Sequence, residues 1–204
     1  MKRGVWALVA APLLLGIAGA EVATPSFEGK SLDHWMRVLR EVPKDPARAS
    51  QDWRKAPWAL GKIGVPALPG LIEALGDDSP EVRLRAIRPI LAMGPTASDA
   101  APVLTGLLAD ADSRVRQWSA AALGQIGPAA AGAAPALINA LGDPDATVRQ
   151  AAAAALGAIG AAEAAPRLRD ALSDSNKAVQ RAARLALEHI EGKPGGAPKD
   201  DSPR

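Results

Sequence analysis

Residues 143–160 read DPDATVRQAAAAALGAIG, and this stretch decides the fold because its pattern recurs along the chain. A valine marks each recurrence, with 33 residues from Val82 to Val115, 33 from Val115 to Val148 and 31 from Val148 to Val179. Leucines precede each valine by eleven and seven residues, an Asp precedes it by five, and apolar residues follow it by eight and eleven. A period of this length indicates stacked supersecondary units.

Each unit divides into two predicted helices. The first is short and begins near a proline, which the first helical turn tolerates because its amides need no partner. The second begins at a polar cap three residues before the valine, and a glycine twelve residues after the valine ends it. The prolines are Pro69, Pro102, Pro135 and Pro166; the caps are Ser79, Asp112, Asp145 and Asn176; the glycines are Gly94, Gly127 and Gly160. The sequence therefore predicts an all-α solenoid of about five helical hairpins.

The predicted solenoid covers residues 31–191, and what flanks it has a different character. Its units are expected at about 31–64, 65–94, 95–127, 128–160 and 161–191, and the first is an atypical cap because Asp52 replaces the valine. Residues 1–20 have the charged start, apolar stretch and small-residue cleavage site of a secretory signal peptide, so the protein is expected to be exported to the periplasm or the exterior. Contact with a membrane would come only through this segment if it stays uncleaved. Residues 21–30 are expected to form an extended leader and 192–204 a disordered tail.

Composition excludes several classes of function. The chain has no Cys, which excludes disulfides, thiol chemistry and cysteine metal sites. Lys and Arg number 24 against 22 Asp and Glu, and loss of residues 1–20 removes two cations, leaving 22 against 22. This balance does not support a general attraction to nucleic acid, so no nucleic acid partner is expected.

Catalytic and cofactor motifs are not found. The only histidines, His34 and His189, lie in opposite terminal units, and a metal site would need more converging ligands. No Gly-x-Ser-x-Gly elbow and no phosphate-binding glycine loop occurs. No catalytic residue, metal or cofactor is therefore assigned.

The pattern in residues 143–160 runs Asp, then Val-Arg, then Ala-Ala-x-Ala-Leu-Gly-x-Ile-Gly, and residues 110–127 repeat it with Ser119 at one Ala. In this pattern the chain resembles the HEAT-repeat family, in the variant called PBS-lyase-like, and residues 29–35 look like the start of secreted bacterial members. The resemblance implies a right-handed α-α superhelix. It does not imply one function, since the family hosts scaffolds, transport receptors and some enzymes.

Two enzymatic groups that share the repeat fit the sequence poorly. Deoxyhypusine hydroxylases hold iron with several His-Glu pairs, whereas here Trp35 follows His34 and Ile190 follows His189. Bilin lyase subunits act on intracellular proteins, and the predicted signal peptide argues against that setting. An enzyme or lyase-type subunit stays an alternative to the scaffold.

A row of Asp and Arg recurs with the repeat. Its members are Asp77 and Arg83, Asp110 and Arg116, and Asp143 and Arg149, each Arg six residues after its Asp. One interpretation is an anion-binding ladder. The other, which Arg fork geometry favours, is a structural row of hydrogen bonds that ties the turns of adjacent units together.

The second helices differ along the chain in the residues that should line the inner, concave wall. Those of the first two units carry cations and a tryptophan, the third has a tryptophan between glutamines, and the fourth offers mainly Ala. We expect a docking surface for an acidic or extended segment of a protein partner, because Arg and Trp dominate interface energies. Its residues are Arg54, Trp58, Arg85, Arg88 and Trp118. The alternatives are tryptophans that only fill gaps between helices, or a surface that binds an anionic polymer.

Overall fold

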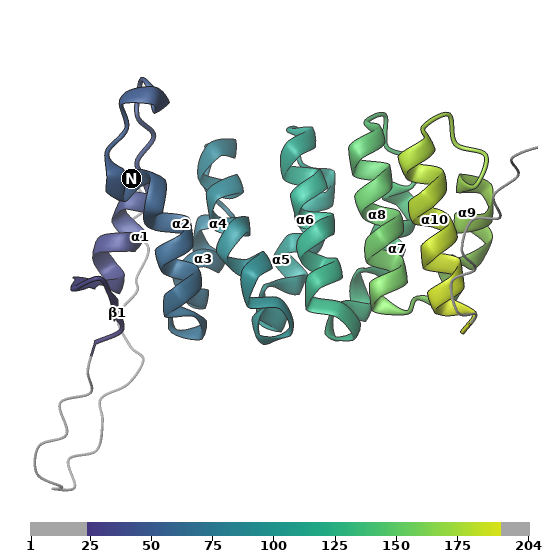
Figure 1. The fold of residues 1–204 in the computed structure, drawn as a ribbon, viewed down its shortest axis with the longest axis horizontal. Coiled ribbons are helices and arrows are strands. Elements are labelled where there is room, and N and C mark those ends of the chain that lie inside the picture. The colour runs from purple at the N-terminus through teal and green to yellow at the C-terminus, as the bar shows by residue number, and fades with distance from the viewer. Residues whose placement is uncertain (1–23, 193–204) are drawn as a thin grey trace, which may run out of the picture.

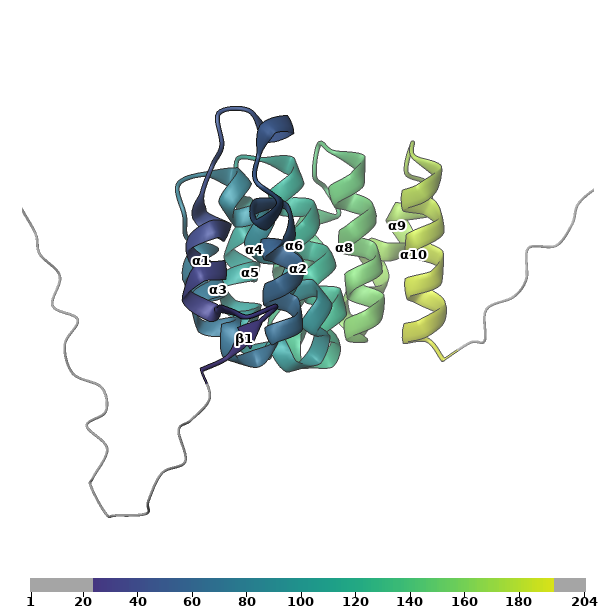
Figure 2. The ribbon, with the colours of Figure 1, turned by 60° about the vertical axis from the view of Figure 1, so that its left-hand side comes forward.

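The computed structural model describes residues 24–192, and it is an α-solenoid of five helical hairpins (Figure 1). Figure 2 shows the helices in two layers, one of odd-numbered and one of even-numbered helices. The odd layer comprises α1 (Leu32–Arg40), α3 (Leu68–Ala74), α5 (Ala101–Gly106), α7 (Ala134–Ala140) and α9 (Ala165–Ala171). The even layer comprises α2 (Gln51–Ile63), α4 (Pro80–Met93), α6 (Ser113–Ile126), α8 (Ala146–Ile159) and α10 (Lys177–Ile190). The predicted fold class is confirmed.

Short 3-10 turns link these helices, and two short strands precede them. The turns are η1 (Pro46–Arg48), η2 (Val65–Ala67), η3 (Gly94–Ala100), η4 (Leu107–Ala109), η5 (Gly127–Ala133) and η6 (Ala162–Ala164). The strands are β1 (Ser26–Phe27) and β2 (Lys30–Ser31). The expected signal peptide at 1–20 and the expected tail beyond Gly192 lie outside the described residues.

The apolar spine of the solenoid contains the repeated valines. Val82 is 1% exposed, and Val115, Val148 and Val179 are 0% exposed. The leucines of the short odd helices, among them Leu71, Leu104, Leu137 and Leu168, are fully buried as well. The phase of the repeat predicted from the sequence is therefore correct.

The four polar residues predicted to cap the second helices lie at the helix starts, but one of them makes no capping hydrogen bond with its side chain. Asp112, Asp145 and Asn176 each accept a hydrogen bond from the amide two residues on. Ser79 makes no such bond. The two serines that do cap helices, Ser31 and Ser50, accept from the amide three residues on and have ψ of 161° and 158°, whereas ψ of Ser79 is 119°. Ser79 thus has the backbone geometry of an Asp cap with a side chain too short for it.

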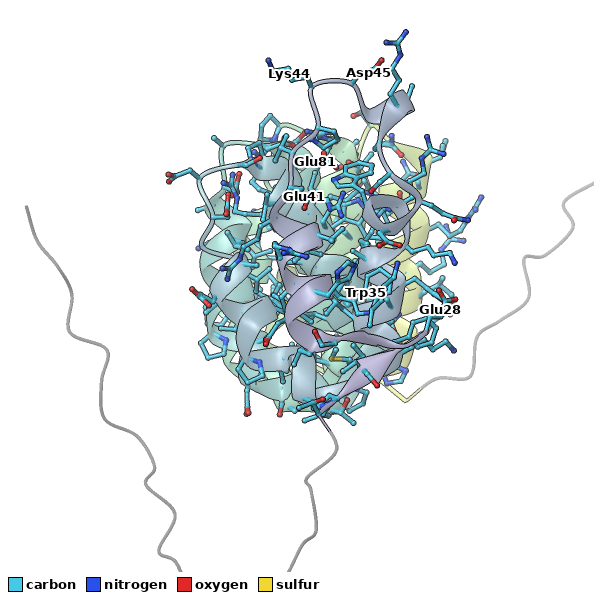
Figure 3. The ribbon with its side chains drawn as sticks, turned by 90° about the vertical axis from the view of Figure 1, so that its left-hand side faces the viewer. Glu28, Trp35, Glu41, Lys44, Asp45 and Glu81 are labelled. Atoms are coloured by element: carbon cyan, nitrogen blue, oxygen red, sulfur yellow. The ribbon has the colours of Figure 1, made fainter. Side chains whose placement is uncertain are left out.

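Residues expected as an extended leader include a β-hairpin that closes the first unit. β1 and β2 pair antiparallel, and their two-residue turn, Glu28 and Gly29, has φ of 51° and 72°, the positive values that tight hairpin turns need. The indole Nε1 of Trp35 donates to the carbonyl of Phe27 at 3.2 Å. Figure 3 looks at this end of the solenoid, with Trp35 beside the hairpin.

By length and composition alone, one described stretch, Ser113–Ala140, is apolar enough to cross a membrane. It is not one continuous rod. Gly127, with φ of 72°, ends α6, and a 3-10 turn separates α6 from α7. Both helices supply buried residues to the common core of the stack, which accounts for the high hydropathy.

Among the described glycines, Gly157 of α8 has the closest neighbour, and the sequence pattern did not explain this glycine. A Cβ on Gly157 of α8 would lie 2.7 Å from Cα and 2.9 Å from Cβ of Ala186 in α10. We expect Gly157→Ala to destabilise the fold by about 1–2 kcal/mol, since overpacking costs about 1–3 kcal/mol and the higher helix propensity of Ala returns up to about 1. Urea unfolding followed by circular dichroism measures the difference.

Gly61 of α2 is the matched control, because it occupies the same position in the first unit. A Cβ there would meet Pro89 and Ala92 at 3.8 Å, an ordinary van der Waals contact. Gly61→Ala is therefore expected to be neutral or to stabilise by up to about 1 kcal/mol. Equal effects of the two substitutions would contradict the close approach of α8 and α10.

Candidate interaction surface

The row of Asp and Arg forms hydrogen bonds between adjacent units, as the structural interpretation predicts. Each Arg of the row bonds to its own unit and to the next one. Arg116 donates from Nε and Nη2 to both carboxylate oxygens of Asp143 in the next unit, at 2.8 and 2.9 Å. Its Nη1 donates to the carbonyl of Asp110 in its own unit at 2.9 Å. Arg149 pairs in the same way with Asp174. Arg83 donates from Nη2 to Asp110 at 2.9 Å and from Nη1 to the carbonyl of Asp77, while its Nε is in ion-pair contact with Asp110 without a hydrogen bond. The guanidinium groups are thus used within the solenoid.

The carboxylates of Asp143 and Asp174 each accept hydrogen bonds from an Arg side chain and from a backbone amide. Besides the Arg, Asp143 accepts from the amide of Asp145 at 2.8 Å, and Asp174 accepts from the amide of Asn176 at 2.8 Å. The Arg149 guanidinium lowers the pKa of Asp174. Burial would raise the pKa of Asp143, but the hydrogen bonds from Arg116 and from the Asp145 amide outweigh burial and lower it. Both groups therefore stay ionised to lower pH than a free Asp.

The last unit ends the row. Gln180 stands where the other units have Arg, and its Nε2 donates to the carbonyl of Asp174 at 2.6 Å. This reproduces the bond within the unit and omits the one to a following unit, which suits a terminal repeat.

The expected docking role of Arg85 is wrong. Arg85 is only 4% exposed and its guanidinium lies 3.9 Å from the centre of the Trp53 ring. Its Nη2 donates to the carbonyls of Trp53 at 2.7 Å and Val38 at 3.3 Å. Pro57, four residues after Trp53, has no amide hydrogen, so the Trp53 carbonyl lacks its helical donor and Arg85 supplies one. Val38 lies in the last turn of α1, and its carbonyl also accepts from the amide of Glu41 at 3.4 Å.

Arg85 carries this positive charge without a carboxylate hydrogen-bonded to it among the described residues. Burial lowers its pKa to about 10. Two backbone carbonyls and the face of an indole ring replace the water that the cation has lost. Arg85 therefore joins α1, α2 and α4, and the first two units depend on it.

The other N-terminal residues expected in the docking surface, Arg54, Trp58 and Arg88, line a groove of about 440 Å³ between α2 and α4. Trp58 is 53% exposed at its edge. Arg54, Lys62 and Arg88 supply three cations, and Pro57, Gly61, Pro89 and Ala92 complete the lining. Phe27 of β1 supports Trp58 in an edge-on contact, with ring centres 4.9 Å apart. We call this site the Trp58 groove.

The three cations of the Trp58 groove have no carboxylate partner among the described residues. Arg54 donates to the backbone carbonyl of Ala47 at 2.6 Å, and the ammonium of Lys62 lies 5.8 Å from the Trp58 ring centre. Arg88 is exposed and makes no hydrogen bond or ion pair within residues 24–192. These cations differ in this respect from the arginines of the Asp-Arg row.

Trp118 lies on α6, one even helix beyond the groove. It is 38% exposed and does not line the Trp58 groove. Its position on the second helix, three residues after the valine, places it on the exposed side of the even layer. It therefore extends the aromatic surface toward the C-terminal units without sharing the first groove.

The two histidines occupy different environments. His34 lies with its Nε2 3.0 Å from Oδ2 of Asp52, which also pairs with Lys30. The bond from Lys30, followed by that from His34, lowers the pKa of Asp52. His189 is exposed near the end of α10. Within residues 24–192 no group of three or more His, Cys, Asp or Glu side chains is placed to hold a metal ion.

A second groove, of about 470 Å³, lies between α8 and α10. Leu185 is 57% exposed there, and Gln150, Arg181 and His189 are its polar residues. The rest of its lining is Gly157 and alanines of both helices. We call it the Leu185 groove. Sequence analysis missed it because Ala-rich helices suggested a surface without features.

The model of the HEAT repeats matches residues 68–134 and 102–188, which together span more than half of the chain. The chain belongs to the HEAT-repeat family. No curated protein sequence matches it. The HEAT assignment agrees with the stacked hairpins and with the repeated Asp and Arg of each unit.

Solved structures share this HEAT/armadillo-type fold. The complex of CpcE and CpcF of phycocyanin lyase from Nostoc sp. PCC7120 is similar at 25% identity and a TM-score of 0.64, over 90% of this chain and 70% of that chain. A designed armadillo repeat protein in complex with the peptide (KR)4 is 21% identical with a TM-score of 0.59, over 78% and 81%. Kap121p is 18% identical with a TM-score of 0.58, over 78% of this chain and 20% of its own.

Proposed function

We propose that this protein is an exported, non-catalytic scaffold whose even helices bind an acidic, extended segment of a protein partner. The Trp58 groove is the main contact, and Trp118 extends it. Export is part of the proposal and rests on the sequence of residues 1–20.

The observation that carries the proposal is the set of unpaired cations beside an exposed tryptophan. Every Arg of the Asp-Arg row has its carboxylate, but Arg54, Lys62 and Arg88 have none among the described residues. A half-exposed Trp58 offers apolar area, and Pro57 with Pro89 makes part of the groove stiff. An aromatic anchor ringed by Arg is typical of the centre of a protein interface.

The structural relatives support a protein partner in general terms. One is a solenoid in complex with the peptide (KR)4, and another is a complex of two proteins, CpcE and CpcF. The groove in the present chain carries positive charge, so the complementary segment is acidic. A segment that is already extended can lie across several parallel helices and contact each one.

Fluorescence anisotropy with a labelled glutamate-rich peptide of about twelve residues tests this proposal. Trp58→Ala is expected to weaken binding by about 2 kcal/mol, roughly a thirtyfold rise in Kd. Arg88→Ala should weaken it by about tenfold and reduce its dependence on salt. Arg184→Ala, which removes an exposed cation of α10, is the control and should leave Kd within about twofold.

Two outcomes would contradict the proposal. One is binding of the peptide that is equally strong in Trp58→Ala, Arg88→Ala and the parent, with melting curves showing all three folded. The other is tighter binding of a single-stranded DNA of equal charge, which would indicate a surface for anionic polymers.

A further inference from the structure

The Trp58 and Leu185 grooves occupy equivalent places at opposite ends of the even layer. Trp58 and Leu185 both stand six residues after the position of the repeat valine, and Lys62 and His189 both stand ten after it. Because equivalent positions of stacked repeats face the same way, both grooves open on the same side of the solenoid. Trp118 lies on α6, between the two pairs of helices.

The two grooves select different chemistry. The Trp58 groove has three cations that have no carboxylate partner within residues 24–192. The Leu185 groove is lined by Gly157, alanines and an exposed leucine, with a single formal cation, Arg181. Alanine and glycine are too small to fill the Leu185 groove. A partner's side chain can therefore reach the backbone of α8 and α10. Exposed apolar surface of this kind is stabilised when an aliphatic or aromatic side chain covers it.

The stacking of the helices sets the distance between the grooves. One lies between α2 and α4 and the other between α8 and α10, which is three helix spacings further along. Packed helices lie roughly 8–10 Å apart, so the grooves are roughly 24–30 Å apart. An extended chain rises about 3.3 Å per residue, so about seven to nine residues bridge them.

We infer that the partner segment has two anchors, an acidic block in the Trp58 groove and, about seven to nine residues along, an aliphatic or aromatic side chain in the Leu185 groove. This inference rests on the proposed function and adds the partner's second anchor and its spacing. Arg181 and the three cations of the first groove favour an overall acidic segment throughout.

A series of labelled peptides tests the spacing with the full chain. Each carries a block of about four glutamates, a Gly-Ser spacer of variable length and a terminal Leu-Phe pair, and both chain directions are made. We expect the lowest Kd at spacers near eight residues, at least about tenfold below that of the glutamate block alone, because the second contact becomes intramolecular. A spacer of about three residues cannot span the grooves and should give no gain.

Leu185→Glu is the diagnostic variant. Leu185 is largely exposed, so the substitution places a charge in the second groove without disturbing the core. It should remove the tenfold gain and leave the Kd of the glutamate block unchanged. Asn139→Glu, at an exposed residue of α7 in the odd layer, introduces the same charge away from both grooves and should retain the gain.

The possible failures are distinguishable. If the glutamate block itself does not bind, the proposed function is wrong and the inference falls with it. If the block binds but the gain is equal at every spacer length, or persists in Leu185→Glu, the proposed second anchor is wrong. The proposed binding of the acidic block in the Trp58 groove is then unaffected.

Discussion

Leu123→Ala is expected to lower the free energy of unfolding by about 2–5 kcal/mol, the range for truncation of a fully buried leucine. Leu123 is 0% exposed in α6, the middle helix of the even layer. Units on both sides depend on contact with this one, because each repeat is stabilised by its nearest neighbours. Urea unfolding monitored by circular dichroism gives the difference directly.

The control for Leu123→Ala is the same substitution at a surface leucine. Leu185→Ala removes the same atoms from a side chain that is 57% exposed, and its expected cost is below about 0.5 kcal/mol. Loss of less than about 1 kcal/mol at Leu123 would mean that the packing of α6 has been misplaced.

Arg116→Ala is expected to cost about 2–4 kcal/mol, because the substitution leaves the nearly buried carboxylate of Asp143 without its partner. The side chains of Arg116 and Asp143 are 14% and 8% exposed, so water replaces the lost bonds only in part. The carbonyl of Asp110 loses its donor at the same time. Thermal and urea unfolding of the variant measure the loss.

Arg114→Ala is the matched control two residues earlier on the same helix. Arg114 pairs with Asp112 at 2.7 Å, but its side chain is 60% exposed and the pair lies within one turn. Exposed ion pairs contribute less than about 1 kcal/mol, so this variant should be close to the parent. If both variants lose the same stability, the bonds between units are no stronger than surface pairs.

The sequence was sufficient for the fold because one periodicity determines it. The repeated valines, leucines and caps occupy equal positions in each unit, and a pattern of that kind can be satisfied only by stacking. Val115 and Val148 are fully buried as expected. The direction of the Asp-Arg bonds, from each Arg to the Asp of the following unit, could not be read from spacing alone.

The errors arise where one residue alters the environment of another that is distant in sequence. Pro57 removes a hydrogen bond donor from α2, and Arg85, 28 positions later, fills the gap and is buried. Periodicity places Arg85 on the exposed side and contains no information about that orphan carbonyl. Gly157 was likewise unexplained, because its role appears only when Ala186 lies against it.

The candidate site was predicted in part. Trp58, Arg54 and Arg88 do line one groove, and Lys62, Pro57 and Pro89 join them there. Sequence analysis had grouped Trp118 with these residues in one docking surface and had expected no features on the alanine-rich helices. Instead the proline-containing helices at one end and the alanine-rich helices at the other make two separate hollows.

The direction of the Asp-Arg bonds has a consequence for how such a chain can grow. The third and fourth units each accept through their Asp from the unit before them and donate through their Arg to the unit after them. A duplicated stretch of one full period would bring both halves of the connection with it, and no other residue would have to change. Gene duplication can therefore lengthen this protein, and any surface it presents, in whole steps, while the terminal units keep closing the two ends.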